Sequence, residues 1–206
     1  MSYMVAGRLV LLGVALILTI SCGSSTTSSA TAPSTTTLHA EVTDPPGDAV
    51  ASAGAPNPPD MVHGTVDVIG GNVTFAIQFV PGTLNGQSTT LTIDLDTDQN
   101  ASTGVPGATG LGIDYVVAVR ANTNQALVER ATPGTCPAGS CFIDVGTASA
   151  TLGTDSMIVT VPLATLGNAS GRLNYRVFAY ALPPGAAVTN ESDVMPDTNL
   201  PPAHVP

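Results

Sequence analysis

The sequence predicts an all-β fold, either a sandwich or a barrel of many short strands. Apolar and polar residues alternate with a period of two in several runs, and turn signals such as GGN, NGQ and PGT separate these runs. Glycine and proline are frequent, with 21 and 17 residues. No segment longer than about six residues shows a helical period. No repeat at a fixed period indicates a solenoid or a propeller.

The expected strands can be read in chain order from this alternation. In NVTFAIQFV (72–80), Val73, Phe75 and Ile77 share one face, and polar residues occupy the other. Period-two runs also occur at 65–70, 88–96, 112–120, 125–130, 155–162 and 172–181. Only PLATLG (162–167) is expected to form a single helical turn.

Residues 1–21 are expected to be a lipoprotein signal peptide. The apolar run LVLLGVALILTI has 12 residues, which is short for a membrane span of about 20 residues and fits the h-region of a signal peptide. It ends in LTISC, which resembles a bacterial lipobox with Cys22 as the lipidated residue, although Thr19 stands where Leu is commonest. A plain secretory signal with a chance Cys is the alternative.

The Ser/Thr-rich stretch that follows, within 22–38, is too poor in large apolar residues to fold and is expected to be a flexible tether. Acyl chains on Cys22 would anchor the protein to a bacterial membrane, facing outside the cytoplasm. The folded β domain is then expected to span 39–206.

The charge balance argues against nucleic acid as a partner. The chain has 15 acidic and 5 basic residues, a formal charge of -10, and all of its basic residues are Arg. Binding to phosphates depends on clustered Lys and Arg, and no such patch occurs.

Cys136 and Cys141 are expected to form a disulfide. They lie in GTCPAGSC, and two such thiols outside the cytoplasm should pair. The loop closed is small, so the gain in stability should be at most about 2–3 kcal/mol. A redox or metal-binding pair is the alternative, but CxxxxC lacks redox spacing and no His is nearby.

An acidic loop is the most distinctive chemical feature. LTIDLDTDQNASTG places Asp94, Asp96, Asp98 and Asn100 at every second position. Neighbouring carboxylates raise each other's pKa and strain a fold, and the chain has no Lys to neutralise them. Calcium takes about six to eight oxygen ligands of this kind, so a structural Ca2+ site is expected.

Asp114, in GIDY, is expected to return to this loop as a further ligand. The loop is not an EF-hand, since Gln99 and Val105 stand at its sixth and twelfth positions, where that motif needs Gly and Glu. A solvated Asx-rich turn without metal is the alternative.

Several motifs in order resemble bacterial secreted domains of the DOMON-like and family 9 carbohydrate-binding-module-like superfamily. They are DPPGD (44–48), PPDM (58–61), IDLDTDQNASTG (93–104), GIDYVV (112–117) and VPLATLG (161–167). The resemblance implies an antiparallel β-sandwich of jelly-roll type with structural calcium. Its members bind sugars, haem or no known ligand, so function stays open.

Sugar capture usually relies on stacking against aromatic rings, and this chain has no Trp. Tyr115 is the candidate ligand-binding residue. Asp44 and Asp48, in DPPGD, are interpreted as turn residues, with a second cation site as the alternative. Asp193 and Asp197 are given no role.

No catalytic motif is present: the sequence has no GxSxG, HExxH or phosphate loop. We expect a surface-anchored, non-catalytic, calcium-stabilised binding module, with a polysaccharide as the candidate ligand. The alternatives are a structural or adhesion component of the cell envelope without a small ligand and, less favoured, a secreted hydrolase.

Overall fold

The computed structural model describes residues 37–51, 58–86, 88–107, 110–120, 122–134, 141–168, 170–181 and 192–206. Contacts divide the chain into two units, Met1–Pro33 and Ser34–Pro206, and all described residues lie in the second. The expected signal peptide, Cys22 and nearly all of the tether therefore lie outside the described residues. No helix in the described ranges has the length and hydropathy needed to cross a membrane.

The regular elements of the described residues are all strands, which confirms the all-β, antiparallel prediction. In chain order they are β1 Leu38–Thr43, β2 Met61–Ile69, β3 Asn72–Phe79, β4 Thr89–Asp96, β5 Val105–Pro106, β6 Gly112–Ile113, β7 Tyr115–Arg120, β8 Gln125–Ala131, β9 Phe142–Leu152, β10 Ser156–Pro162, β11 Leu173–Ala181, β12 Asp193–Met195 and β13 Ala203–Val205.

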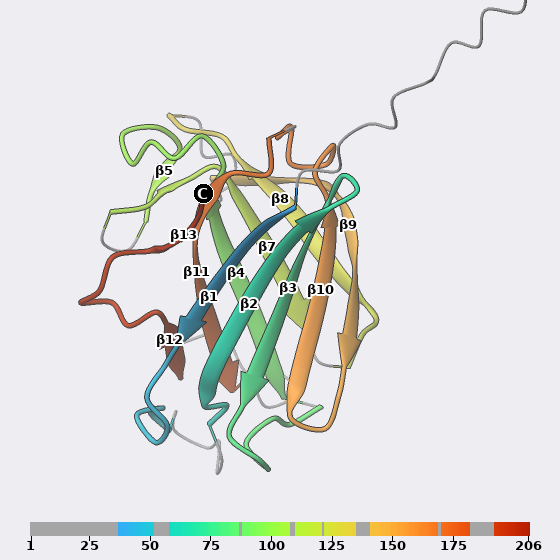
Figure 1. Ribbon diagram of the computed structural model, residues 1–206, viewed down its shortest axis with the longest axis vertical. Helices are drawn as coiled ribbons and strands as arrows, with labels where there is room; N and C mark the ends of the chain where they lie inside the picture. The colour runs from blue at the N-terminus through green and yellow to red at the C-terminus, as the bar shows by residue number, and fades with distance from the viewer. Residues whose placement is uncertain are drawn as a thin grey trace, which may run out of the picture. The chain divides into compact units, whose positions relative to one another are not determined.

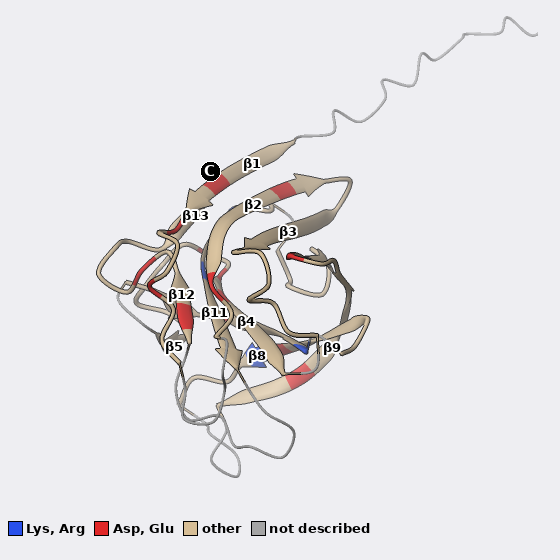
Figure 2. Cartoon of the chain, turned by 90° about the horizontal axis from the view of Figure 1, so that it is seen from below, with Lys and Arg blue, Asp and Glu red and all other residues tan. Residues whose placement is uncertain are grey.

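Most strands belong to one antiparallel sheet (Figure 1). Its order is β1-β2-β3-β10-β9-β8-β7-β4-β11-β12, with β13 also paired to β11, and β5 and β6 form a separate small ribbon. The strands thus follow one continuous hydrogen-bonded path instead of dividing between two sheets. β1 also contacts β13, and β12 contacts β2. The sheet is therefore nearly closed into a barrel-like form, as the view along the strands shows (Figure 2).

The core follows from the alternation seen in the sequence. Val73, Phe75 and Ile77 of β3 are fully buried, because successive residues of a strand point to opposite faces of the sheet. The Phe75 ring meets the ring of Tyr175 on β11 edge to face, with centroids 5.6 Å apart. Strands distant in the chain thus share one hydrophobic interior.

The glycine pair in the GGN signal forms the turn between β2 and β3. Gly70 and Gly71 both have positive φ, 59° and 83°. A two-residue hairpin loop of type I′ requires this conformation, so these residues fix the register that places Val68 opposite Val73.

At 162–167, PLATLG ends β10 and then forms a single turn with bonds of the 3-10 type. The amide of Leu166 donates to the carbonyl of Leu163 (3.1 Å), and that of Gly167 donates to Ala164 (3.3 Å). The alternation does not predict five of the observed strands, β1, β5, β9, β12 and β13.

Candidate calcium site

The acidic loop begins where β4 ends. Asp96 is the last residue of that strand, and its side chain is fully buried. The amide of Asn100 turns back and donates to one carboxylate oxygen of Asp96 (2.9 Å) and to one of Asp98 (3.0 Å). The Thr103 hydroxyl donates to both oxygens of Asp98, at 3.0 and 2.9 Å. These bonds hold both carboxylates on the inside of the loop.

Asp114 reaches the loop from the junction of β6 and β7. Its amide donates to the carbonyl of Leu95 (2.8 Å), which fixes its place beside the end of β4. Its Oδ2 accepts from the amide and the hydroxyl of Thr97, at 2.9 and 3.0 Å. Asp96, Asp98 and Asp114 each offer one oxygen, and these oxygens lie within 4.8 Å of one another. We call these three residues the loop cluster.

Burial works against the charged form of Asp96. It raises the pKa of that carboxyl, and a hydrogen bond with Asp98 and the charge of Asp114 add to the rise. Hydrogen bonds from Asn100 and Asn174 act on the pKa in the opposite direction. A divalent cation would offset the repulsion, and the donor set of carboxylate oxygens is the one that calcium prefers.

Asp94, expected as a ligand, does not belong to the loop cluster. It lies two residues before β4 ends, and the antiparallel register places it between Arg176 on β11 and Val116 on β7. Burial raises the pKa of Asp94 to about 7, although the charge of Arg176 lowers it. Because β4 is paired on both sides at this position, the Asp94 side chain remains over the sheet while Asp96 enters the loop.

Asn100, also expected as a ligand, lies in the loop but uses its side chain differently. Its Oδ1 accepts from the amide of Ser102 (3.1 Å), as in an ordinary Asx turn. Asn100 contributes to the loop cluster through its backbone amide, which donates to Asp96 and Asp98.

Tyr115 is half-buried and packs against the hydrophobic core. It therefore lies on the opposite face of β7 from Ala118 and Arg120, and it does not form an exposed platform for stacking. Cys141 is described just before β9, but Cys136 lies outside the described residues, so the expected disulfide stays a prediction.

A groove of about 500 Å3 lies on the face of β4, β7, β8 and β9 that is turned away from the core. Most of its accessible surface is apolar, with polar groups from threonines, Arg120 and Gln125 among it. The lining comprises Thr90, Thr92, Ala118, Arg120, Thr123, Gln125, Ala126, Leu127 and Thr147. No pattern in the sequence indicates this groove, because its residues come together only through the pairing of four strands.

A second group of acids, Asp44, Asp48 and Asp193, also converges. Sequence reasoning interprets the first two as turn residues and assigns Asp193 no role. Asp193 follows Asp48 by more than a hundred residues, and only the fold brings them together.

No protein-family model matches the chain, and no curated protein matches it significantly. The fold and the loop cluster define an all-β, antiparallel protein with a candidate cation site, and the superfamily resemblance stays a prediction.

Proposed function

We propose that the β domain is a non-catalytic binding module that calcium stabilises at the loop cluster. The observation that supports the site is the convergence of three carboxylate oxygens within 4.8 Å, one of them from the fully buried Asp96. Oxygens bound to one calcium ion at about 2.3–2.6 Å lie at most about 5 Å apart. The cluster is therefore already close to the size that one ion needs.

The proposed ligand is a polysaccharide, and the groove on β4, β7, β8 and β9 is the proposed place for it. Arg120, Gln125 and threonine hydroxyls lie beside the partly exposed Leu127. A few polar groups that converge beside an apolar side chain suit a ligand with many hydroxyls and an apolar ring face. In this proposal lipid on Cys22 holds the module at the cell envelope.

Removing calcium should lower the melting temperature of the protein. At a calcium concentration of 100 times the dissociation constant, one site contributes about 2.7 kcal/mol to the free energy of unfolding. Asp98→Asn should lose the contribution of the loop cluster, so its calcium-dependent shift in Tm should be smaller than that of the native chain. Differential scanning calorimetry with calcium and with EDTA measures both shifts.

Asp144→Asn is the matched control, since Asp144 is an exposed acid on β9 outside the acidic clusters. It should keep the full calcium-dependent shift. The calcium assignment is wrong if Asp98→Asn responds to EDTA as strongly as the native chain does.

Binding to glycans should depend on the groove. In a glycan array at saturating calcium, Arg120→Ala should weaken binding to the preferred polysaccharide about 10- to 100-fold, because a hydrogen bond to a charged group is worth about 1.5–3 kcal/mol. Gln125→Ala should weaken it less. Gln78→Ala, an exposed change on β3 outside the groove, should leave binding unchanged. Failure of the calcium-loaded native chain to bind any glycan would contradict the proposed ligand.

A further inference from the structure

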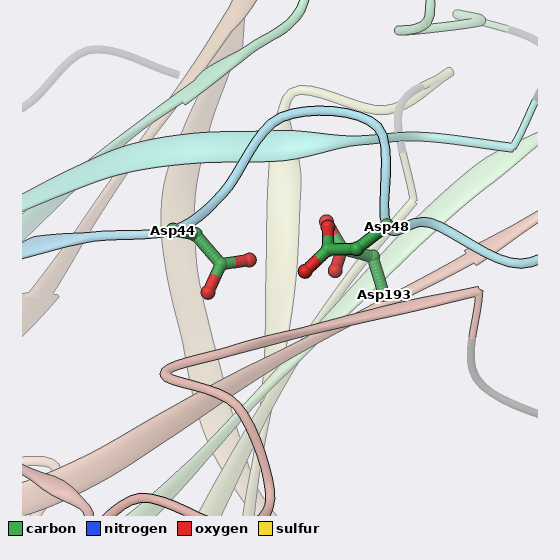
Figure 3. Close-up of side chains that lie close together, drawn as sticks. All are labelled: Asp44, Asp48 and Asp193. Atoms are coloured by element: carbon green, nitrogen blue, oxygen red, sulfur yellow. The ribbon is translucent and has the colours of Figure 1, made fainter.

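The second acidic group lies where the two ends of the sheet meet. Asp44 follows β1, Asp48 ends the Pro-Pro-Gly turn after it, and Asp193 begins β12 (Figure 3). One oxygen from each carboxylate lies within 4.8 Å of the others. Because β1 and β12 stand at opposite ends of the strand order, this group, which we call the seam cluster, joins the two ends of the sheet.

Backbone hydrogen bonds hold the seam cluster in place. The amide of Asp44 donates to the carbonyl of Val62 (3.0 Å), and the amide of Val50 donates to the carbonyl of Ser192 (2.7 Å). The Asp193 carboxylate accepts from the amides of Met61 (2.5 Å) and Val194 (2.8 Å). These bonds fix Asp44 and Asp193, and the bond between Val50 and Ser192 holds the segment that follows Asp48 beside them.

Asp44 is the observation that points to a ligand. Its side chain is only 6% exposed, and neither of its carboxylate oxygens has a hydrogen-bond partner among the described residues. Figure 3 shows this carboxylate directed toward Asp48 and Asp193. A buried carboxylate without a partner is costly unless a cation or a proton compensates it.

The electrostatics of the cluster favour a bound cation. Burial raises the pKa of Asp44 to about 8, with further contributions from Asp193 and Asp48. Burial also raises the pKa of Asp193 to about 6, although its two backbone hydrogen bonds lower it. The nearby Asp60 adds negative charge and has one buried oxygen without a partner of its own among the described residues.

Within the described part of the chain, no ion pair joins these acids to a basic side chain. The chain has no Lys, and the Arg176 guanidinium donates to the carbonyls of Asp197 and Leu200. A cavity of about 400 Å3 opens beside the cluster and is lined by Asp48, Asp193 and Asp197, among others. This cavity gives a hydrated ion access to Asp48 and Asp193.

We propose that Asp44, Asp48 and Asp193 bind a second calcium ion, which fastens the connection between β1 and β2 to β12 and so closes the sheet. Oxygens within 4.8 Å of one another fit a single ion with ligands at about 2.3–2.6 Å.

This seam site is separate from the loop cluster. Asp96 pairs with Asn174 near the start of β11, whereas Asp193 pairs with Ala179 further along the same strand. Five residues of a strand span about 16 Å, so one ion cannot serve both clusters.

Equilibrium dialysis of the full-length chain against calcium chloride, after treatment with EDTA, counts the sites. The native chain should bind two equivalents. Asp44→Asn, Asp48→Asn and Asp98→Asn should each bind one, and Asp48→Asn/Asp98→Asn should bind none. Asp144→Asn should bind two. Asp48 is exposed, so its variant keeps the test valid if Asp44→Asn does not fold.

The outcomes separate this site from the proposed function. If Asp44→Asn and Asp48→Asn bind as many equivalents as the native chain and Asp98→Asn binds one fewer, the seam site is wrong while the loop site stands. If only Asp98→Asn binds as many as the native chain, the loop site is wrong and the seam site stands.

The melting temperature of Asp44→Asn, measured with and without calcium, distinguishes an ion ligand from a residue that only supports the fold. Without calcium, Asp44→Asn should melt at a higher temperature than the native chain, because it removes an uncompensated buried acid. With saturating calcium the order should reverse, because the variant lacks the ion. A lower melting temperature for Asp44→Asn in both conditions would overturn the proposal.

Discussion

Replacing Arg176 by alanine should lower the free energy of unfolding by about 3–5 kcal/mol, because it removes a large buried side chain and leaves two carbonyls without their donor. The Arg176 side chain is fully buried on β11, opposite Asp94 on β4. It donates to the carbonyls of Asp197 (3.1 Å) and Leu200 (2.7 Å). The variant would leave those two carbonyls without their donor and Asp94 without a neighbouring positive charge.

Urea denaturation measures this loss, and a second substitution identifies its origin. Asp94→Asn/Arg176→Ala should be less destabilised than the sum of the two single variants, because the amide needs no counter-charge. Arg172→Ala is the control: its side chain is exposed, and surface changes usually cost less than about 0.5 kcal/mol. A cost for Arg176→Ala as small as that of the control would contradict the prediction.

Gly112→Ala should cost about 3 kcal/mol, the upper end for overpacking, and should also remove the calcium response of the loop cluster. A Cβ at this position would lie 2.2 Å from the carbonyl oxygen of Thr103 and 2.8 Å from that of Asn100. Both oxygens belong to the backbone of the acidic loop, so the loop must move as a whole. The movement separates Asp98 from Asp114.

Calorimetry with calcium and with EDTA tests this variant. Its calcium-dependent shift in Tm should fall to that of Asp98→Asn. Gly146→Ala is the matched control, because its added Cβ would meet only a side-chain methyl of Thr165, at 3.2 Å. If Gly112→Ala kept the calcium-dependent shift in Tm of the native chain, the close approach of Gly112 to the acidic loop would not be needed to position the loop cluster.

The central strands could be predicted from the sequence because their residues alternate strictly between the two faces. β3 and β10 have core residues at every second position, and this period alone is enough to predict both as strands. β9 is exposed along much of its length, so its apolar residues show no clean period. β12 and β13 have three residues each, too few for an alternating pattern to be recognised.

The loop cluster could be predicted in part because Asp96 and Asp98 are neighbours in the chain and Asp114 follows at the start of the next long strand. The sequence could not separate Asp94 from the loop cluster, because the alternate spacing of the acids does not show where β4 ends. For the seam cluster, the sequence offered a cation site at Asp44 and Asp48 only as the alternative to a turn. It could not add Asp193, since Asp193 reaches Asp44 only after β12 has paired with β11 at the far end of the sheet. An acid in a Pro-Gly turn gives no hint of such a distant neighbour.

The carboxyl-terminal strand is tied directly to the acidic loop. The Gln99 amide donates to the carbonyl of Val205 (3.1 Å) and is hydrogen-bonded to His204 (2.9 Å), and β13 pairs with β11 next to Asp96. An affinity tag fused behind Pro206 would therefore disturb the acidic loop and with it the loop cluster. Purification handles for such work are better inserted before Leu38, where the chain enters β1.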